Sequence, residues 1–137
     1  MVTTREMISF VQESTAVDEV SSETDIFSDV GCTGNDFHEL IEKYTKKYSV
    51  DMSSYLWYFH ADEEGANFSI GSIFSKPPYE RVKRIAIHPQ MLTNFANEGR
   101  WTIKYPEHKL PKYRVDIWIG LFVFLVAIFF AIRSCVE

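Results

Sequence analysis

The C-terminal part of this 137-residue chain contains an apolar stretch without any charged residue, from Ile117 to Ile132. Its sixteen residues fall short of the ~20 that a helix usually needs to cross a bilayer, but Val115 and the long side chain of Arg133 extend it. A buried core helix is the alternative, and a helix that is apolar on every side would need a larger protein around it than this chain supplies. We therefore expect residues 115–133 to form one transmembrane helix, followed by a short tail over residues 134–137.

The charges on either side of this stretch predict its orientation. Residues 1–10 are polar and of mixed charge, so they do not form a signal peptide, and the apolar stretch has to act as both signal and anchor. Several basic residues precede it and only Arg133 follows it, so the positive-inside bias keeps the N-terminal domain in the cytoplasm. In a bacterium this single-pass anchor would lie in the inner membrane. The preceding basic residues are Lys104, Lys109, Lys112 and Arg114.

The remainder of the chain is acidic in its first part and basic in its second. Residues 1–75 contain fourteen acidic residues and four basic ones, whereas residues 76–116 contain nine basic residues and four acidic ones. The basic part lies next to the expected membrane helix, and each base near an anionic membrane surface is worth ~1 kcal/mol. We expect the four basic residues before the span to contact anionic lipid headgroups. Nucleic-acid binding is not expected, because the acidic part would repel phosphate.

One amphipathic helix is expected from about Gly34 to Tyr48. Thr33 and Asp36 have the spacing of a capping box, in which each side chain satisfies a free backbone N–H at the helix start. Glutamates and lysines fall on the opposite face, and the lysines lie toward the C-terminal end, where they complement the helix dipole. The apolar residues that recur on one helical face are Phe37, Leu40, Ile41, Tyr44 and Tyr48.

Three further helices are expected around it. Thr3 and Glu6 form a second capping-box pattern, which opens a helix that ends near Ser14. Serines precede a short aromatic-rich helix over residues 53–59. His88-Pro89 opens the last soluble helix, whose face contains Met91, Leu92, Phe95 and Ala96 and which Gly99 caps.

The connecting segments have their own expected roles. Ile26 and Phe27 are apolar pegs for the helical core, and Trp101 folds back onto it. Residues 79–87 form either a strand or an extended connector. Two prolines make residues 104–114 a short basic tether, which keeps the domain next to the membrane.

Three features could indicate ligand stacking, metal binding or a reactive thiol, but in each case the neighbouring residues favour a structural role. The aromatic run at 55–59 could stack bases or sugars, but it contains no basic residue and is better explained as core. His60 with the acids at 62–64 could bind a metal, although a solvated helix end is the interpretation that we adopt. Cys32 could be a reactive thiol near a helix start, but no histidine lies nearby, and we expect an inert loop cysteine. Cys32 and Cys135 provide neither a disulfide framework nor a metal site.

The start of the helix at 34–48 resembles the Asp-Leu-Gly-x-Asp-Ser-Leu-Asp segment of acyl carrier proteins. Further segments resemble a bacterial family of small acyl-carrier-like proteins that is catalogued as a domain of unknown function. The resemblance covers about residues 3–103, with an insertion between about Gly65 and Arg84. The residues that carry it are Asp29-Val30-Gly31-Cys32-Thr33-Gly34-Asn35-Asp36 with Glu39-Leu40, then Ile85-x-Ile87-x-Pro89-x-Met91-Leu92 and Phe95-Ala96-x-x-Gly99-Arg100-Trp101.

The resemblance implies a mainly α fold. The expected architecture is an acyl-carrier-like four-helix bundle over residues 1–103, with a small irregular or short-strand insertion, the tether and one C-terminal transmembrane helix. In a carrier a serine at the start of the second helix receives the phosphopantetheine arm, and here that position is Gly34. Because glycine has no hydroxyl, we expect no cofactor.

The expected function is therefore that of a non-enzymatic, membrane-anchored interaction module, because carriers meet their partners through an acidic second helix. It would dock and regulate or position a membrane-bound or lipid-metabolism protein. A carrier modified at Thr33 or Ser28, acting in lipid or glycolipid synthesis, is one alternative, and a structural subunit of a membrane complex is another. No catalytic motif and no metal site is expected. The expected partner-binding residues are Thr33, Gly34, Asn35, Asp36, Glu39 and Glu42.

Overall fold

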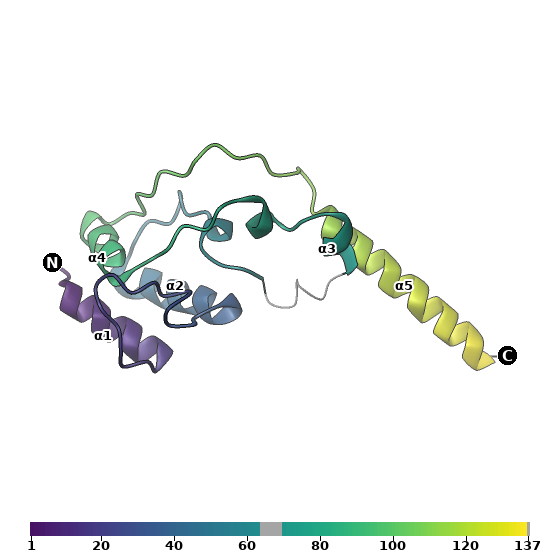
Figure 1. Cartoon of the computed structure of the whole chain (residues 1–137), viewed down its shortest axis with the longest axis horizontal. Coiled ribbons are helices and arrows are strands. Elements are labelled where there is room, and N and C mark those ends of the chain that lie inside the picture. Colours follow the sequence, from purple (N-terminus) through teal and green to yellow (C-terminus); the bar gives the residue numbers. More distant parts are fainter. Residues whose placement is uncertain (64–69, 137) are drawn as a thin grey trace.

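The computed structural model describes residues 1–63 and 70–136 of the chain. In this part the protein is mainly α, with five α-helices and no strand, as the sequence predicts at that level. Figure 1 shows α1, α2 and α4 gathered at one end, while α5 extends away from them and α3 lies beside its first turns. The helices are α1 (Thr4–Thr15), α2 (Gly34–Tyr48), α3 (Ile70–Phe74), α4 (Pro89–Glu98) and α5 (Val115–Val136), with short 3₁₀ helices η1 (Trp57–Phe59) and η3 (Pro78–Arg81).

The predicted capping box of α1 is confirmed. The Glu6 N–H donates to Thr3 Oγ1 at 3.3 Å, and the Thr3 N–H donates to Glu6 Oε2 at 2.9 Å. The two bonds satisfy donors that the first turn of a helix leaves free. Met7, Phe10 and Val11 are all buried, so the apolar stripe of α1 faces the core.

The predicted bounds of α2 and the core-facing side of α4 are also confirmed. Phe37, Leu40, Ile41 and Tyr44 of α2 are buried. The Tyr44 hydroxyl donates to the Leu92 carbonyl oxygen of α4 at 2.7 Å, which satisfies a polar atom that burial would otherwise penalise. Gly99 ends α4 with a φ of 70°, a conformation that glycine adopts without strain. Ile26 and Trp101 are buried in the same core, as predicted.

Two expected local structures are wrong. Thr33 precedes α2 but its side chain makes no capping hydrogen bond. No serine caps the aromatic segment either, because η1 is only three residues long and follows Leu56. Ser54 Oγ instead donates to the Trp101 carbonyl oxygen at 2.5 Å. The Ser54 hydroxyl thus bonds a partner 47 residues away and not a local helix start.

Residues 82–88 form an extended connector and not a strand. The Ile85 N–H donates to the Phe59 carbonyl oxygen at 2.7 Å, and the Ile87 carbonyl oxygen accepts from the Ile26 N–H at 3.0 Å. These are single bonds to two different segments, so they build no ladder. Residues 64–69 of the expected insertion lie outside the described residues.

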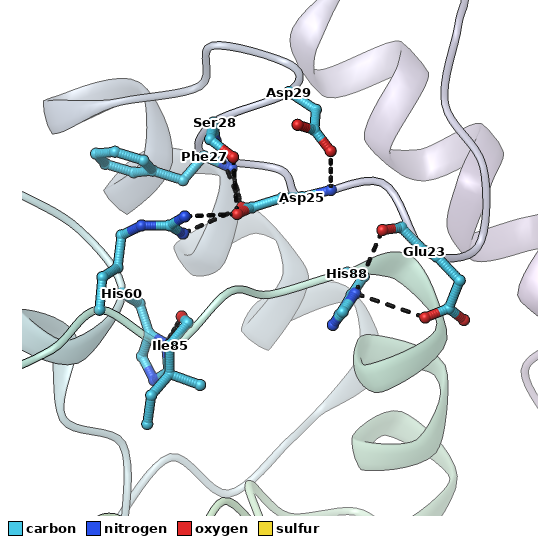
Figure 2. A network of polar contacts seen from close by, with 9 residues as sticks. Glu23, Asp25, Phe27, Ser28, Asp29, His60, Ile85 and His88 are labelled. Carbon is cyan, nitrogen blue, oxygen red and sulfur yellow. Dashed lines mark hydrogen bonds and ion pairs between the residues drawn. The ribbon is translucent and has the colours of Figure 1, made fainter.

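The solvated helix end expected at His60 is wrong, because the side chain of His60 is completely buried. Its Nδ1 lies 2.9 Å from the Ile85 carbonyl oxygen (Figure 2), and its Nε2 lies 2.8 Å from the Tyr105 hydroxyl. A carbonyl oxygen only accepts, so Nδ1 donates and Nε2 accepts from Tyr105. The Tyr105 oxygen in turn accepts from the Trp101 Nε1–H at 2.8 Å and from the Leu56 N–H at 3.2 Å. The first part of the expected tether is therefore fixed in the domain.

Helix α5 is long and apolar enough to cross a membrane, and it is the one such helix in the part of the chain that the structure describes. Only 6% of its apolar stretch is buried. This exposure excludes the alternative of a buried core helix within the described chain. The apolar segment extends from Val115 to Cys135, two residues further than the expected helix.

We predict that acid destabilises the protein through His60. Burial disfavours the charged ring and lowers the pKa of His60 to about 4. The unfolded chain, with an ordinary histidine pKa of ~6.5, binds a proton that the folded chain does not bind, so stability is lost as the pH falls below that value. Urea unfolding of the full chain in detergent should give a free energy of unfolding ~2 kcal/mol lower at pH 5 than at pH 7.5.

The matched variant is His60→Gln, which keeps a donor and an acceptor but does not titrate. Its free energy of unfolding should change much less over the same pH range. An equal pH dependence in both proteins would show that His60 is not the responsible group.

Candidate functional site

The candidate site is the start of α2 together with the turn that leads into it. The turn is fixed by the Asp25 carboxylate, which accepts from Arg84 Nη2 at 2.6 Å and from Ser28 Oγ at 2.8 Å (Figure 2). Asp29 closes the turn by accepting from the Asp25 N–H at 2.9 Å. Although burial acts in the opposite direction, the hydrogen bonds from Arg84 and Ser28 lower the pKa of Asp25. Asp25 therefore stays charged and holds the turn against the connector at 82–88.

The backbone between this turn and α2 depends on glycine at one point. Gly31 has a φ of 75°, which costs an L-residue strain even though a Cβ there would meet no atom within 4 Å. This geometry lets the Cys32 N–H donate back to the Ile26 carbonyl oxygen at 3.2 Å. The Cys32 side chain points inward and is buried, and burial with the nearby Asp36 charge raises its pKa to about 11. The thiol is thus protonated at neutral pH, in agreement with the expected inert loop cysteine.

Gly34 is the first residue of α2 and is buried. Its N–H donates to Asp62 Oδ1 at 3.0 Å, so a carboxylate 28 residues further along the chain satisfies one of the N–H groups that the start of a helix leaves free. A negative charge there also complements the helix dipole. Gly34 has a φ of 53°, so a side chain at this position would strain the backbone.

The other residues of the expected docking surface are exposed, namely Thr33, Asn35, Asp36, Glu39 and Glu42. Two of them pair within the helix, because Glu39 lies 2.7 Å from Lys43 and Glu42 lies 2.5 Å from Lys46. Such exposed pairs contribute little to stability, because water screens them. Asp36 forms no ion pair with the described residues. The negative potential of α2 is therefore concentrated in its first turn.

A cleft of about 230 Å³ lies between this first turn and the C-terminal end of α1. Asp36, Glu39 and Lys43 of α2 line one side, and Ser14 and Thr15 of α1 line the other. The cleft contains charges of both signs and hydroxyl groups, which suits a polar segment of a protein better than an apolar ligand. Among the described residues, no group of three or more histidine, cysteine or acidic side chains could hold a metal.

The expected membrane-surface residues divide into two groups. Lys104, Lys109 and Lys112 are exposed. Arg114 instead binds Glu63 with two hydrogen bonds of 2.9 Å and Asp116 with a shortest bond of 2.6 Å. The hydrogen bonds that Arg114 donates to Asp116 and Glu63 raise the pKa of Arg114 above its ordinary range. The charge of Arg114 is thus used within the protein, between the domain and the start of α5.

Local sequence patterns did not predict the roles of Asp62 and Glu63. Both lie in a run of acids that is typical of a solvated surface. The one hint is that the acids begin two residues after His60, the histidine that ends the aromatic segment. Their partners, Gly34 and Arg114, are 28 and 51 residues away.

We predict that Asp62→Ala destabilises the start of α2. The change removes the acceptor of the Gly34 N–H, and loss of such a cap costs ~1 kcal/mol. Hydrogen exchange should become faster at the Gly34 and Asn35 amides, while the amides around Tyr44 stay protected.

Two variants serve as controls for this prediction. Asp62→Asn keeps an acceptor oxygen and should restore part of the protection. Glu42→Ala removes an exposed acid from α2 that bonds no helix-start amide, and it should leave the exchange of Gly34 unchanged. Equal exchange in Asp62→Ala and the wild type would contradict the capping role.

Comparison with known proteins gives one match. No curated protein and no solved structure matches this chain. A family model described as a protein of unknown function, DUF1493, matches residues 3–104. The match covers most of the chain, including the start of α2 and its partner Asp62, and it ends before α5. The chain therefore belongs to the DUF1493 family.

Proposed function

We propose that this protein is a membrane-anchored, non-enzymatic interaction module with an acyl-carrier-like fold that has lost the site of phosphopantetheine attachment. It docks a membrane-bound or lipid-handling protein through the first turn of α2 and regulates or positions that protein. The observation that carries the proposal is the state of this turn. Gly34, at the attachment position, is buried and has no hydroxyl, whereas Asn35 and Asp36 beside it are exposed.

The order of elements supports the carrier-like part of the proposal. A first helix is followed by a long loop with the buried peg Ile26, then by an Asp29-Val30-Gly31 turn and a second helix. Asp25 and Arg84 hold this turn in a fixed position at the start of α2. A pre-formed turn loses little entropy on binding, so it suits recognition.

The charges of α2 indicate what kind of surface it meets. Asp36 is available at the first turn, while Lys43 and Lys46 neutralise Glu39 and Glu42 further along. A partner with a small basic patch opposite Asp36 would fit this surface, because complementary potentials favour encounter and register. The lysines at the C-terminal end of α2 would repel a partner whose binding surface is basic along the whole length of the helix.

The length of α5 and its basic flank support a location at a membrane. In the proposal α5 crosses the inner membrane once, the domain is cytoplasmic, and Lys104, Lys109 and Lys112 contact anionic headgroups. The half-buried Tyr105, whose hydroxyl bonds His60, shortens the free part of the tether, so the domain stays close to the bilayer.

A carrier modified at an atypical residue is the second candidate. Thr33 favours it, because this residue is exposed and its hydroxyl makes no capping hydrogen bond. Intact mass measurement of the full chain, after expression with an active phosphopantetheinyl transferase, decides the matter. Our proposal predicts an unmodified mass, and an adduct with the mass of the arm would favour the carrier instead.

We predict that Glu39→Lys with Glu42→Lys abolishes recovery of the partner from solubilised membranes. The double change places two lysines on α2 close to Asp36, where they repel the basic patch proposed for the partner. Both ion pairs that it removes are exposed, so little stability is lost. The measurement is the amount of membrane protein recovered with the tagged full chain, quantified by mass spectrometry.

The matched control is Glu13→Lys with Glu19→Lys, which makes the same change in charge at exposed positions in and just after α1. Recovery should be unaffected in this control. Equal recovery with both double variants and with the wild type would exclude α2 as the docking surface.

A further inference from the structure

Helix α3 exposes large apolar side chains that the proposed function does not use. Ile73 is 79% exposed, Phe74 is 70% exposed and Ile70 is 48% exposed. Only Gly71 of this helix is buried. Exposed apolar side chains that cluster in this way, instead of occurring singly, mark an interaction site in a soluble domain.

The position of α3 identifies what this surface meets. Gly71 lies against the backbone of Asp116, so closely that a Cβ at Gly71 would overlap the Asp116 carbonyl oxygen. Glycine is therefore required for the approach of the two helices. Asp116 belongs to the first turn of α5, and the candidate span begins at Val115. Figure 1 shows α3 beside this end of α5.

A second contact holds the domain at the same place. Arg114 joins Glu63, in the loop that caps α2, to Asp116 of α5. The Asp116 side chain is only 9% exposed, so this ion cluster is partly shielded from water and from screening by salt. The neighbourhood of α3 is thus fixed to the first turn of α5 by both a close backbone contact and paired charges.

The residues around this contact are those of a membrane–water interface. Tyr113 and Trp118, both about two-thirds exposed, flank the start of the span, and aromatic residues of this kind gather at the level of the headgroups. Lys76 follows α3 by two residues, Lys112 precedes α5 by three, and both are exposed. Lysines in these positions suit anionic headgroups. The Lys112 amine lies 5.6 Å from the Tyr113 ring centroid.

We propose that α3 is a second membrane contact, in which Ile70, Ile73 and Phe74 enter the interfacial layer of the bilayer beside the first turn of α5. The proposal rests on the membrane location given under the proposed function, because α3 reaches lipid only if α5 spans the bilayer. Its consequence is that the domain has two points of attachment, α5 and α3. One orientation of the domain toward the bilayer is thereby favoured, and the start of α2 is presented at a set height.

The test uses the full chain in vesicles of phosphatidylcholine and phosphatidylglycerol. Single nitroxide labels are attached through Ile73→Cys and Phe74→Cys, in a background with Cys32→Ala and Cys135→Ser. Both positions are exposed, so the labels replace no packing contact. Collision of each label with oxygen, which concentrates in lipid, is compared with its collision with a water-soluble nickel chelate. Leu125→Cys in the span and Ser9→Cys on α1 are the lipid and water references.

We expect the oxygen-to-nickel ratio at both positions to be several-fold above that of Ser9→Cys and to approach that of Leu125→Cys. A ratio at the level of Ser9→Cys, with Leu125→Cys still in lipid, overturns the contact of α3 and leaves the proposed function intact. Low collision with both reagents would mean that protein covers α3, either a second copy or a partner, and it also overturns the proposal. A water-like ratio at Leu125→Cys would overturn the span itself, and with it both the membrane location and the contact of α3.

Discussion

The Tyr105 hydroxyl is the contact on which the arrangement of the molecule depends. It donates to His60 and accepts from Trp101 and from the Leu56 N–H, so all of its hydrogen-bonding capacity is used inside the domain. The uncharged state of His60 is a condition of this network, because a protonated ring could no longer accept from Tyr105. The network fixes the start of the tether against the segment at 56–60. Directly after this segment come Asp62, which bonds the start of α2, and Glu63, which bonds Arg114 before α5.

The short segment from His60 to Glu63 therefore contacts the connector at 82–88, the tether, the start of α2 and the residue before α5. His60 binds the connector at Ile85 and the tether, Asp62 satisfies the first amide of α2, and Glu63 pairs with Arg114 beside α5. The proposed docking surface and the proposed membrane span are thus connected through four consecutive residues.

Local periodicity predicted the helices well, because α1, α2 and α4 each bury a stripe with the spacing of one helical face. It failed where a residue is satisfied from far away. Tyr105 lies 45 residues from His60, and Asp62 lies 28 residues from Gly34, so no local pattern contains these pairs. The acids after His60 therefore led to the prediction of a solvated helix end, whereas the His60 side chain is buried and bonds Tyr105. At the candidate site the exposed acidic residues of α2 were predicted from the sequence, but Asp62, which caps the start of the helix, was not.

In the proposal, the first turn of α2 docks a protein at the membrane surface. Photocrosslinking in intact cells, with the full chain and an unnatural photoreactive amino acid at Asn35, can identify that protein. We predict one discrete adduct with a membrane-bound or lipid-handling protein from Asn35, and none from the same amino acid at the exposed residue Glu13 of α1. No adduct from Asn35, or the same adducts from both positions, would contradict it.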